Sequence, residues 1–175
     1  MAIKPILFNA EMVRAILDGR KTCTRRVVKL PKNMSGRPVG KSGDIGFMYL
    51  GGIKRPPYQH GDILYVRETW CKGSWMNEKE RYYYKADDND FLCTWHPSIH
   101  MPKEAARIWL RVTGVRVERL QDIYGKGCVK EGIEEEPLKD VGDEFVKGMF
   151  HDLWDSTLKK SDIDRYGWDA NPWVW

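Results

Sequence analysis

Basic and hydroxyl side chains crowd into the segment 17–27, LDGRKTCTRRV, directly after a helical pattern ends. Lys21, Arg25 and Arg26 lie close together in it, with Thr24 among them. Such a set can bind an anion, can supply a hydroxyl and a base for catalysis, or can form an ordinary solvated strand edge, which lysine and arginine commonly guard. The residue types alone leave all three interpretations open.

The segment TCTRRVVKL, residues 22–30, is rich in β-branched residues and predicts a strand. Because strand side chains alternate between two faces, one face would carry Thr22, Thr24 and Arg26, and the other Lys21, Cys23 and Arg25. Lys21 and Thr24 can therefore act together only if the chain bends just after Gly19.

A metal site is the next chemistry to consider. Cys93, His96 and His100 have the spacing Cys-x2-His-x3-His, which resembles part of a zinc site. No fourth ligand at a matching spacing is evident in the sequence, and a loop bracketed by prolines needs no metal. We therefore predict no metal and no other cofactor. The four cysteines lie far apart, which does not indicate a disulfide framework.

Two carboxylates elsewhere could take part in a site. Glu131 closes a predicted short helix before a glycine, where a glutamate is usually solvated. Glu68 and Trp70 fall on one face of the strand VRETW, and a carboxylate beside an indole can hold a base by hydrogen bonding and stacking. For that pair we favour the simpler interpretation, a core tryptophan beside a charge that a nearby arginine satisfies.

Helices that could position these residues are predicted from apolar side chains at helical spacing. The first covers NAEMVRAILDG, with Asn9 as its N-cap and Gly19 just after its end, and its apolar face holds Met12, Val13, Ile16 and Leu17. The second covers DEFVKGMFHDLWDSTL, and its apolar face holds Phe145, Met149, Leu153 and the region of Thr157 and Leu158. A shorter helix in LQDIYGKGCVKEGI is weakened by Gly125 and Gly127.

Strands are predicted in KPILF, ILYVRETW, RYYYKAD, ARIWLRVTGVRVERL and NPWVW. The Gly- and Pro-rich stretch at about 31–60 predicts an irregular insert, with room for one short hairpin. Many short strands and few helices predict an α+β fold: a small, partly open β-barrel with helices packed on its rim. The length of 175 residues favours a single domain over 1–175.

Composition limits the class of protein. The chain has 29 basic and 25 acidic residues, a net charge of +4, which is weak support for a polyanionic partner. Some of the eight tryptophans could stack on bases. No apolar run reaches the ~18 residues of a membrane span, and MAIKPILFNAEMVR lacks the long apolar region of a signal peptide. We expect a cytoplasmic protein of a bacterial or phage-infected cell, with no membrane partner.

The segment LDGRKTCTRR, following KPILFNAEMVRAI, resembles the opening of an ASCH domain, a member of the PUA-like barrel superfamily. The family's motif, Gly-x-Lys-x-x-Glu-x-Arg, falls on Gly19, Lys21, Thr24 and Arg26, with threonine in place of glutamate. That replacement resembles the branch that hydrolyses N4-acetylcytidine, which has Gly-Arg-Lys-Thr-x-Thr here. The wider chain, including GDILYVRETW, YYYKAD, LWDS and NPWVW, is similar to ASCH proteins of phages and prophages.

The resemblance to the amidohydrolase branch implies a catalytic lysine, threonine and glutamate, which carry over to Lys21, Thr24 and Glu131. A threonine hydroxyl needs a base to take its proton, and a lysine can be that base where burial lowers its pKa. The glutamate would orient the lysine or pass a proton to the leaving amine. A surrounding nucleic-acid or ligand-binding set would be Gly19, Arg20, Arg25, Arg26, Glu68 and Trp70.

Three hypotheses follow for function. The leading one is recognition of RNA or a modified nucleoside, with amide hydrolysis of an N4-acylated cytidine. The second is a nucleic-acid-binding module without catalysis, based on the basic segment and the excess of aromatic residues. The third is a phage accessory protein that acts on a host protein partner through the acidic segment 131–144 or the insert. The oligomeric state is not indicated by the sequence.

Overall fold

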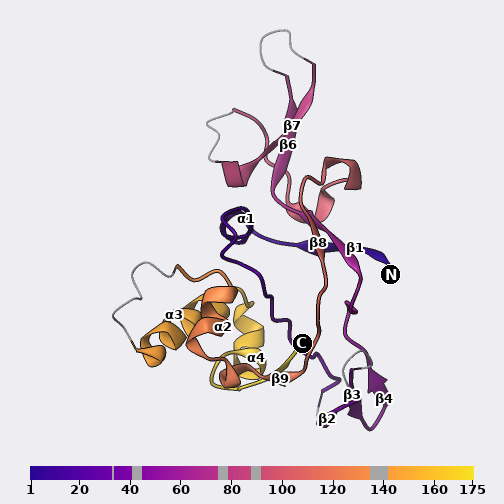
Figure 1. Cartoon of the computed structure of the whole chain (residues 1–175), viewed down its shortest axis with the longest axis vertical. Helices are drawn as coiled ribbons and strands as arrows, with labels where there is room; N and C mark the ends of the chain where they lie inside the picture. The colour runs from indigo at the N-terminus through magenta and orange to yellow at the C-terminus, as the bar shows by residue number, and fades with distance from the viewer. Residues whose placement is uncertain (33, 41–44, 75–78, 88–91, 135–141) are drawn as a thin grey trace. The chain divides into compact units, whose positions relative to one another are not determined.

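The computed structural model describes residues 1–32, 34–40, 45–74, 79–87, 92–134 and 142–175. They form an α+β fold of helices and short strands (Figure 1). The chain folds into two compact units, each built from two separate stretches: unit 1 is Met1–Gly19 with Gly61–Thr113, and unit 2 is Arg20–His60 with Gly114–Trp175. The single domain expected from length stays a prediction.

A three-stranded sheet forms the centre of unit 1. Strand β1 (Ile3–Leu7) runs parallel to β5 (Ile63–Arg67), and β5 pairs in antiparallel fashion with β8 (Trp109–Arg111). One face of the sheet is buried, because Ile6, Leu64 and Val66 are all at most 5% exposed. The strands predicted in KPILF and ILYVRETW are confirmed, although the second ends at Arg67.

Helix α1 (Ala10–Leu17) follows β1 directly, and its ends are as predicted. Asn9 Oδ1 accepts a hydrogen bond from Met12 N at 2.8 Å, which satisfies one of the unpaired N–H groups of the first turn. Gly19 follows the last turn with φ of +74°, a conformation that favours glycine. The predicted apolar face is wrong at Leu17, which is 53% exposed, whereas Val13 and Ala15 are buried.

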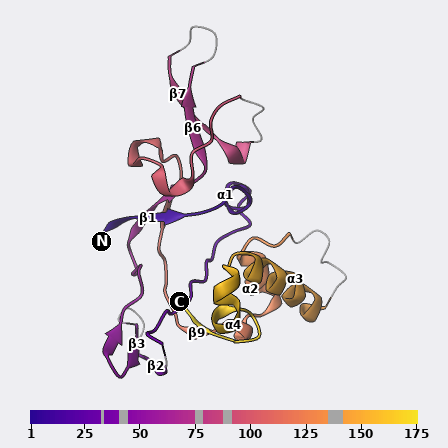
Figure 2. The same cartoon turned by 180° about the vertical axis from the view of Figure 1, so that it is seen from behind.

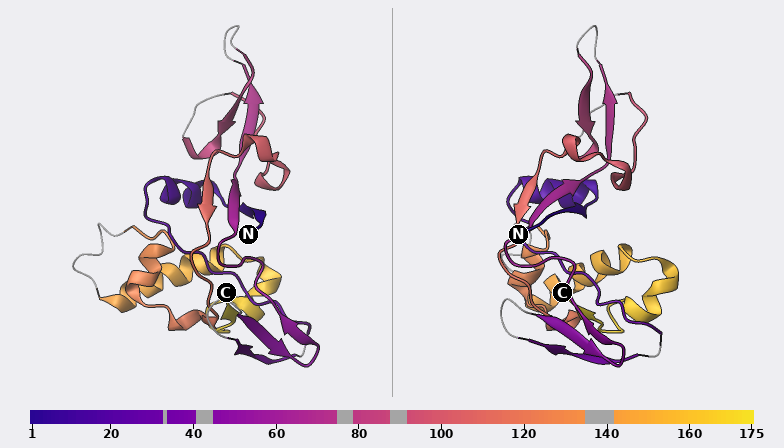
Figure 3. Two further views of the ribbon diagram at one scale, coloured as in Figure 1. Left: turned by 45° about the vertical axis from the view of Figure 1, so that its right-hand side comes forward. Right: turned by 90° about the vertical axis from the view of Figure 1, so that its right-hand side faces the viewer.

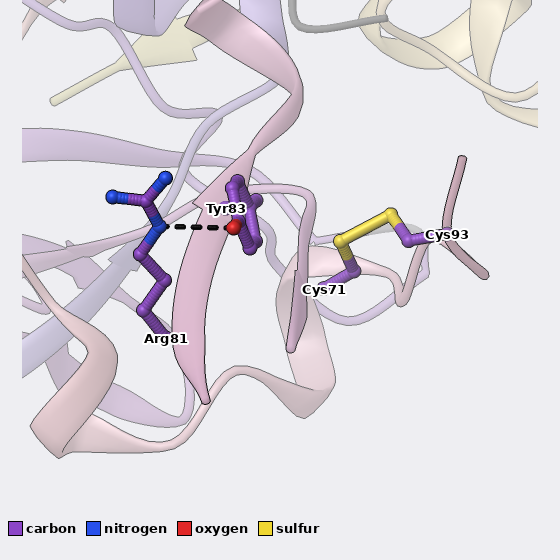
Figure 4. The surroundings of a disulfide bond; sticks show 4 residues. All are labelled: Cys71, Arg81, Tyr83 and Cys93. Atoms are coloured by element: carbon purple, nitrogen blue, oxygen red, sulfur yellow. Dashed lines mark hydrogen bonds between the residues drawn. A yellow bond between two sulfur atoms is a disulfide. The ribbon is translucent and has the colours of Figure 1, made fainter. Parts of the chain in front are cut away.

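A two-stranded hairpin extends unit 1 beyond its sheet (Figure 2). Strand β6 (Trp70–Gly73) pairs with β7 (Arg81–Tyr84), and the short helical turns η1 (Lys85–Asp87), η2 (Ser98–His100) and η3 (Lys103–Ala105) follow. A disulfide joins Cys71 of β6 to Cys93 (Figure 4). Our expectation that the cysteines form no disulfide is therefore wrong for this pair, because the chain returns alongside the hairpin and brings distant cysteines together.

The stretch at about 31–60 contains more regular structure than the sequence predicts. Strands β2 (Gly36–Val39), β3 (Gly46–Tyr49) and β4 (Gly52–Lys54) form an antiparallel sheet in unit 2 (Figure 3). Phe47 of β3 is fully buried, so this segment contributes to the core of unit 2. Residues 33 and 41–44 of the predicted insert lie outside the described residues.

Three helices pack together in the rest of unit 2: α2 (Gly125–Lys130), α3 (Asp143–Ser156) and α4 (Ile163–Tyr166). The turns η4 (Leu120–Asp122) and η6 (Lys160–Asp162) flank them. The core around α2 and α3 includes Leu120, Ile123, Cys128, Val146, Phe150 and Trp154. The predicted apolar face of α3 is confirmed for Met149, Leu153 and Leu158, which pack against this core, but it is wrong at Phe145, which is 58% exposed. Val146 and Phe150, outside the predicted face, are the more deeply buried.

Strand β10 (Trp173–Val174) pairs with β9 (Glu118–Arg119), which confirms the strand predicted in NPWVW. The strand predicted over residues 22–30 is wrong: only an isolated bridge between Val27 and Val174 forms there. Strand alternation therefore does not govern Lys21 and Thr24. The segment follows an irregular path because its hydrogen bonds go partly to a helix end and partly to the C-terminal residues.

The strands of the described ranges form four separate sheets, and none of these sheets closes into a barrel. The predicted α+β class is confirmed, whereas the PUA-like barrel is not. Within the same described ranges, no helix combines the length and the apolar character needed to span a membrane.

Candidate functional site

A buried ion pair between Lys21 and Glu131 lies at the centre of the candidate site in unit 2. Lys21 Nζ donates to Glu131 Oε2 at 2.7 Å and to the Glu131 carbonyl oxygen at 2.8 Å. The two side chains are only 3% and 6% exposed. The structure thus brings together two residues that are 110 positions apart in sequence and that the family resemblance had singled out.

Arg25 holds the other oxygen of the same carboxylate. Its Nη1 donates to Glu131 Oε1 at 3.0 Å, and its Nε donates to Glu118 Oε1 at 2.9 Å. Arg116 Nε lies 2.8 Å from Glu118 Oε2 at the more exposed end of the chain of charges. We call Lys21, Arg25, Glu118 and Glu131 the buried charge cluster. Each of its charges has a partner, as buried charges require.

Backbone hydrogen bonds fix the irregular segment that carries Lys21 and Arg25. The amides of Thr22 and Cys23 both donate to the carbonyl oxygen of Lys130, each at 2.9 Å. Arg26 and Trp175 exchange two backbone hydrogen bonds, at 3.3 and 2.8 Å. The segment is therefore tied at one end to the last turn of α2 and at the other to the C-terminal strand.

The C-terminal end of helix α2 places Glu131 in the buried charge cluster. Glu131 is its C-cap residue, and Gly132 follows with φ of +109°, a conformation that strains any residue with a Cβ. Arg20 Nη1 donates to the Gly132 carbonyl oxygen at 2.7 Å. A Cβ at Gly127 would lie 3.0 Å from Ile123 Cγ1 and 3.5 Å from Arg25 Nη2. Glycine at 127, which seemed only to weaken the helix, therefore lets the Arg25 guanidinium rest against it.

Burial and charge shift the pKa values of the cations in opposite directions. Burial lowers the pKa of Lys21, and Glu131 only partly opposes it. Burial also disfavours the charge on Arg25, but Glu131 and Glu118 outweigh this and raise its pKa. Burial lowers the pKa of Arg26, against the opposing effect of Tyr58 and Glu131. Lys21 is thus the cation of the cluster best suited to give up its proton.

Thr24 is half-buried in the same segment. Within the described part of the chain, no hydrogen bond links its hydroxyl to Lys21 or Glu131. Arg26, also half-buried, interacts electrostatically with Glu131. The structure therefore brings together Lys21, Arg25 and Glu131, with Arg20 at the adjoining helix end. Thr24, the nucleophile that the resemblance implies, is close to Lys21 and Arg25 in sequence but has no direct bond to Lys21 or Glu131 among the described residues.

Glu68 and Trp70 belong to unit 1, as does Gly19. Arg107 donates two hydrogen bonds to the Glu68 carboxylate, from Nε to Oε1 at 2.9 Å and from Nη2 to Oε2 at 3.0 Å. Strand β5 ends at Arg67 and β6 begins at Trp70, so Glu68 and Trp70 do not belong to one continuous strand. The arginine partner matches the simpler interpretation of this pair, a buried charge satisfied within the fold.

Trp70 packs against the aromatic side chains of His96 and Tyr82, with centroid distances of 5.0 and 5.6 Å. The zinc spacing noted in the sequence does not form a ligand set, because the sulfur of Cys93 is bonded to that of Cys71. In the described ranges, no group of three or more His, Cys, Asp or Glu side chains is arranged to hold a metal ion.

Glu118 is the residue of the cluster that sequence reasoning missed. It accepts from both Arg25 and Arg116 and so extends the pairing from Glu131 toward the surface. Its signal in the sequence is slight: it is one acidic residue between two arginines in the strand-like segment RVERL. Only the pairing of β9 with β10 places it beside Arg25.

No protein-family model matches this sequence, and no curated protein or solved structure is significantly similar to it.

Proposed function

We propose that unit 2 recognises RNA or a modified nucleoside and hydrolyses the amide of an N4-acylated cytidine, using Lys21, Thr24 and Glu131. In this proposal the chain is an ASCH-type protein of the PUA-like superfamily. The observation that supports it most is the buried position of Lys21 against Glu131: burial lowers the pKa of the lysine, and the hydrogen bond to Glu131 fixes its direction. A lysine that serves as a general base needs both properties.

The proposed reaction assigns one task to each residue. Neutral Lys21 takes the proton of the Thr24 hydroxyl as its oxygen attacks the amide carbonyl, and Arg26 stabilises the resulting oxyanion. The C–N bond then breaks, and Lys21 returns the proton to the leaving N4 amine, which releases cytidine. Water finally hydrolyses the acyl ester on Thr24 and yields the carboxylic acid. Glu131 orients Lys21, and Arg25 in turn holds Glu131.

Turnover of N4-acetylcytidine tests this proposal, with release of cytidine followed by chromatography. We expect Thr24→Val to lower the rate at least 100-fold, because valine keeps the shape but removes the nucleophile. Thr22→Val is the matched control, since Thr22 is exposed in the same segment, and it should keep the wild-type rate. The wild-type rate should rise with pH as Lys21 loses its proton, below the ordinary lysine value of 10.5.

Absence of cytidine release from the wild-type protein would exclude hydrolysis of this nucleoside. Equal rates for wild type and Thr24→Val would exclude Thr24 as the nucleophile.

A second candidate function is nucleic-acid binding without catalysis. Both carboxylate oxygens of Glu131 and the Lys21 ammonium already take part in ion pairs. This arrangement favours the second candidate, because ion pairs that only stabilise the fold would be arranged in the same way. In that case RNA binding should weaken with salt and survive Thr24→Val unchanged. The host-protein hypothesis names the acidic segment 131–144 or the insert at about 31–60, and residues 135–141 of the first and 33 and 41–44 of the second lie outside the described residues.

A further inference from the structure

The second face of the three-stranded sheet in unit 1 carries aromatic and basic side chains. Residues 64 and 66 point into the core, so strand alternation places their neighbours on the opposite side. The strand register sets Tyr65 opposite Trp109 and Ile63 opposite Arg111. We call this side the outer sheet face. It includes Ile63, Tyr65, Arg67, Trp109 and Arg111, and Lys103 of η3 lies beside the Tyr65 and Trp109 rings.

Two aromatic rings lie side by side on the outer sheet face. The ring centroids of Tyr65 and Trp109 are 5.9 Å apart, with an angle of 43° between the planes. Trp109 is 47% exposed although it is a tryptophan in a strand. Its Nε1 donates to the carbonyl oxygen of Ala106 at 3.3 Å, which fixes the orientation of the indole. A fixed, half-exposed indole next to a tyrosine is a surface on which a flat ring can stack.

Cations surround these rings. Lys103 Nζ lies 5.9 Å from the centroid of the Tyr65 ring and 5.8 Å from that of Trp109. The Arg67 guanidinium carbon lies 5.8 Å from the Tyr65 centroid, and its Nη1 donates to the Ile99 carbonyl oxygen at 3.1 Å. A guanidinium has five N–H donors, so this one bond does not exhaust it. Arg67 is half-buried, whereas Lys103 and, on the neighbouring strand, Arg111 are exposed cations.

The charges on the outer sheet face are unbalanced. Arg25 and Arg107 each pair with carboxylates elsewhere in the protein. Within the described ranges, none of Arg67, Lys103 and Arg111 forms an ion pair with a carboxylate. A surface that offers stacking rings and unneutralised cations together is complementary to a ligand with flat rings and negative charge.

We propose that the outer sheet face binds single-stranded RNA, with unpaired bases stacked on Tyr65 and Trp109 and phosphates near Lys103, Arg67 and Arg111. Single strands fit because their bases expose the flat faces that a duplex hides in its stack. This site is additional to the one proposed in unit 2, and only the choice of RNA over DNA rests on that proposed function. A surface that binds an apolar protein partner would not be expected to carry three cations without carboxylate partners.

Fluorescence anisotropy with a labelled twelve-nucleotide oligouridine tests the rings. Loss of one stacked base costs about 1–3 kcal/mol, so Trp109→Ala should weaken binding about 5- to 150-fold. Trp109→Phe keeps a ring at the position and should retain most of the affinity. Phe145→Ala is the matched control, because Phe145 is an exposed aromatic residue on α3 of unit 2 and should not contribute. Circular dichroism of each variant shows whether it is folded.

The salt dependence of the same binding tests the cations. Removing one phosphate contact should reduce the slope of log Kd against log salt concentration by about 0.7 for a single strand. We expect this change for Lys103→Ala. We expect no change for Lys159→Ala, which removes an exposed lysine from unit 2.

Three results would overturn the assignment: no oligouridine binding at low salt, equal affinities of folded Trp109→Ala and wild type, or tighter binding of oligothymidine than of oligouridine. The first would leave this face to a protein partner. Oligouridine binding is measured without N4-acetylcytidine and hydrolysis without the oligonucleotide, so failure of the proposed hydrolysis and failure of this binding site are separate results.

Discussion

At the scale of single residues, Glu131 is the carboxylate that pairs with both cations of the buried charge cluster in unit 2. It faces Lys21 through one oxygen and Arg25 through the other, and all three side chains are at most 6% exposed. Removing one member of such a buried set is costly, because the remaining charges keep their desolvation penalty and lose their compensation.

Glu131→Gln should therefore lower the free energy of unfolding by about 3 kcal/mol, since it leaves two buried cations facing a neutral amide. Urea denaturation of both proteins measures the difference. Glu134→Gln removes an exposed carboxylate three residues away and should change stability by less than about 0.5 kcal/mol. If the two variants unfold at the same urea concentration, the cluster contributes no net stability.

The sequence identified part of this cluster and missed part of it. Lys21, Arg25 and Glu131 were found because a motif and a helix end drew attention to them. The bend that puts Lys21 and Arg25 on the same carboxylate could not be predicted, because it depends on two amides that share the carbonyl of Lys130. Contacts of this kind join segments more than a hundred residues apart, and no local pattern encodes them.

At the scale of elements, local signals predicted where helices lie better than which way they face. The ends of α1 followed from Asn9 and Gly19, whose side chain and backbone conformation act within one turn. The buried face of α3 followed only in part, because its sequence offers two adjacent apolar rows: Met149 and Leu153 of the predicted row pack at the edge of the core, and Val146 and Phe150 of the other row are buried in it. The choice between adjacent rows is made by tertiary contacts alone.

The hairpin of β6 and β7 provides the prediction at this scale. The disulfide between Cys71 and Cys93 closes a loop of 22 residues, and such a loop restricts the unfolded chain by about 3 kcal/mol. Replacing both cysteines with serine should lower the free energy of unfolding by roughly that amount. Cys23→Ser is the control, because Cys23 is a free, exposed cysteine. A reductant should destabilise the wild type but not the double variant; equal effects on both would argue against the bond.

At the scale of the whole molecule, the chain passes between its two units three times. Unit 2 takes its first part from residues 20–60 and its second from residues 114–175, and unit 1 uses the stretches between. The buried members of the core around helices α2 and α3 all lie in the second part. The first part supplies the cations that pair with Glu131, the bridge from Val27 to Val174, and the buried side chains of Val28 and Phe47.

This division predicts that residues 114–175 do not fold when they are produced alone. The fragment keeps most of the apolar core of unit 2, but it leaves Glu131 buried without a cation and β10 without the hydrogen bonds of Arg26 and Val28. Because a small domain has only a few kcal/mol of net stability, these losses together should exceed it. Thermal unfolding followed by circular dichroism should show a cooperative transition for the full chain and none for the fragment. A cooperative transition in the fragment would mean that its helices suffice, and that the segment from Arg20 onward binds a unit already folded.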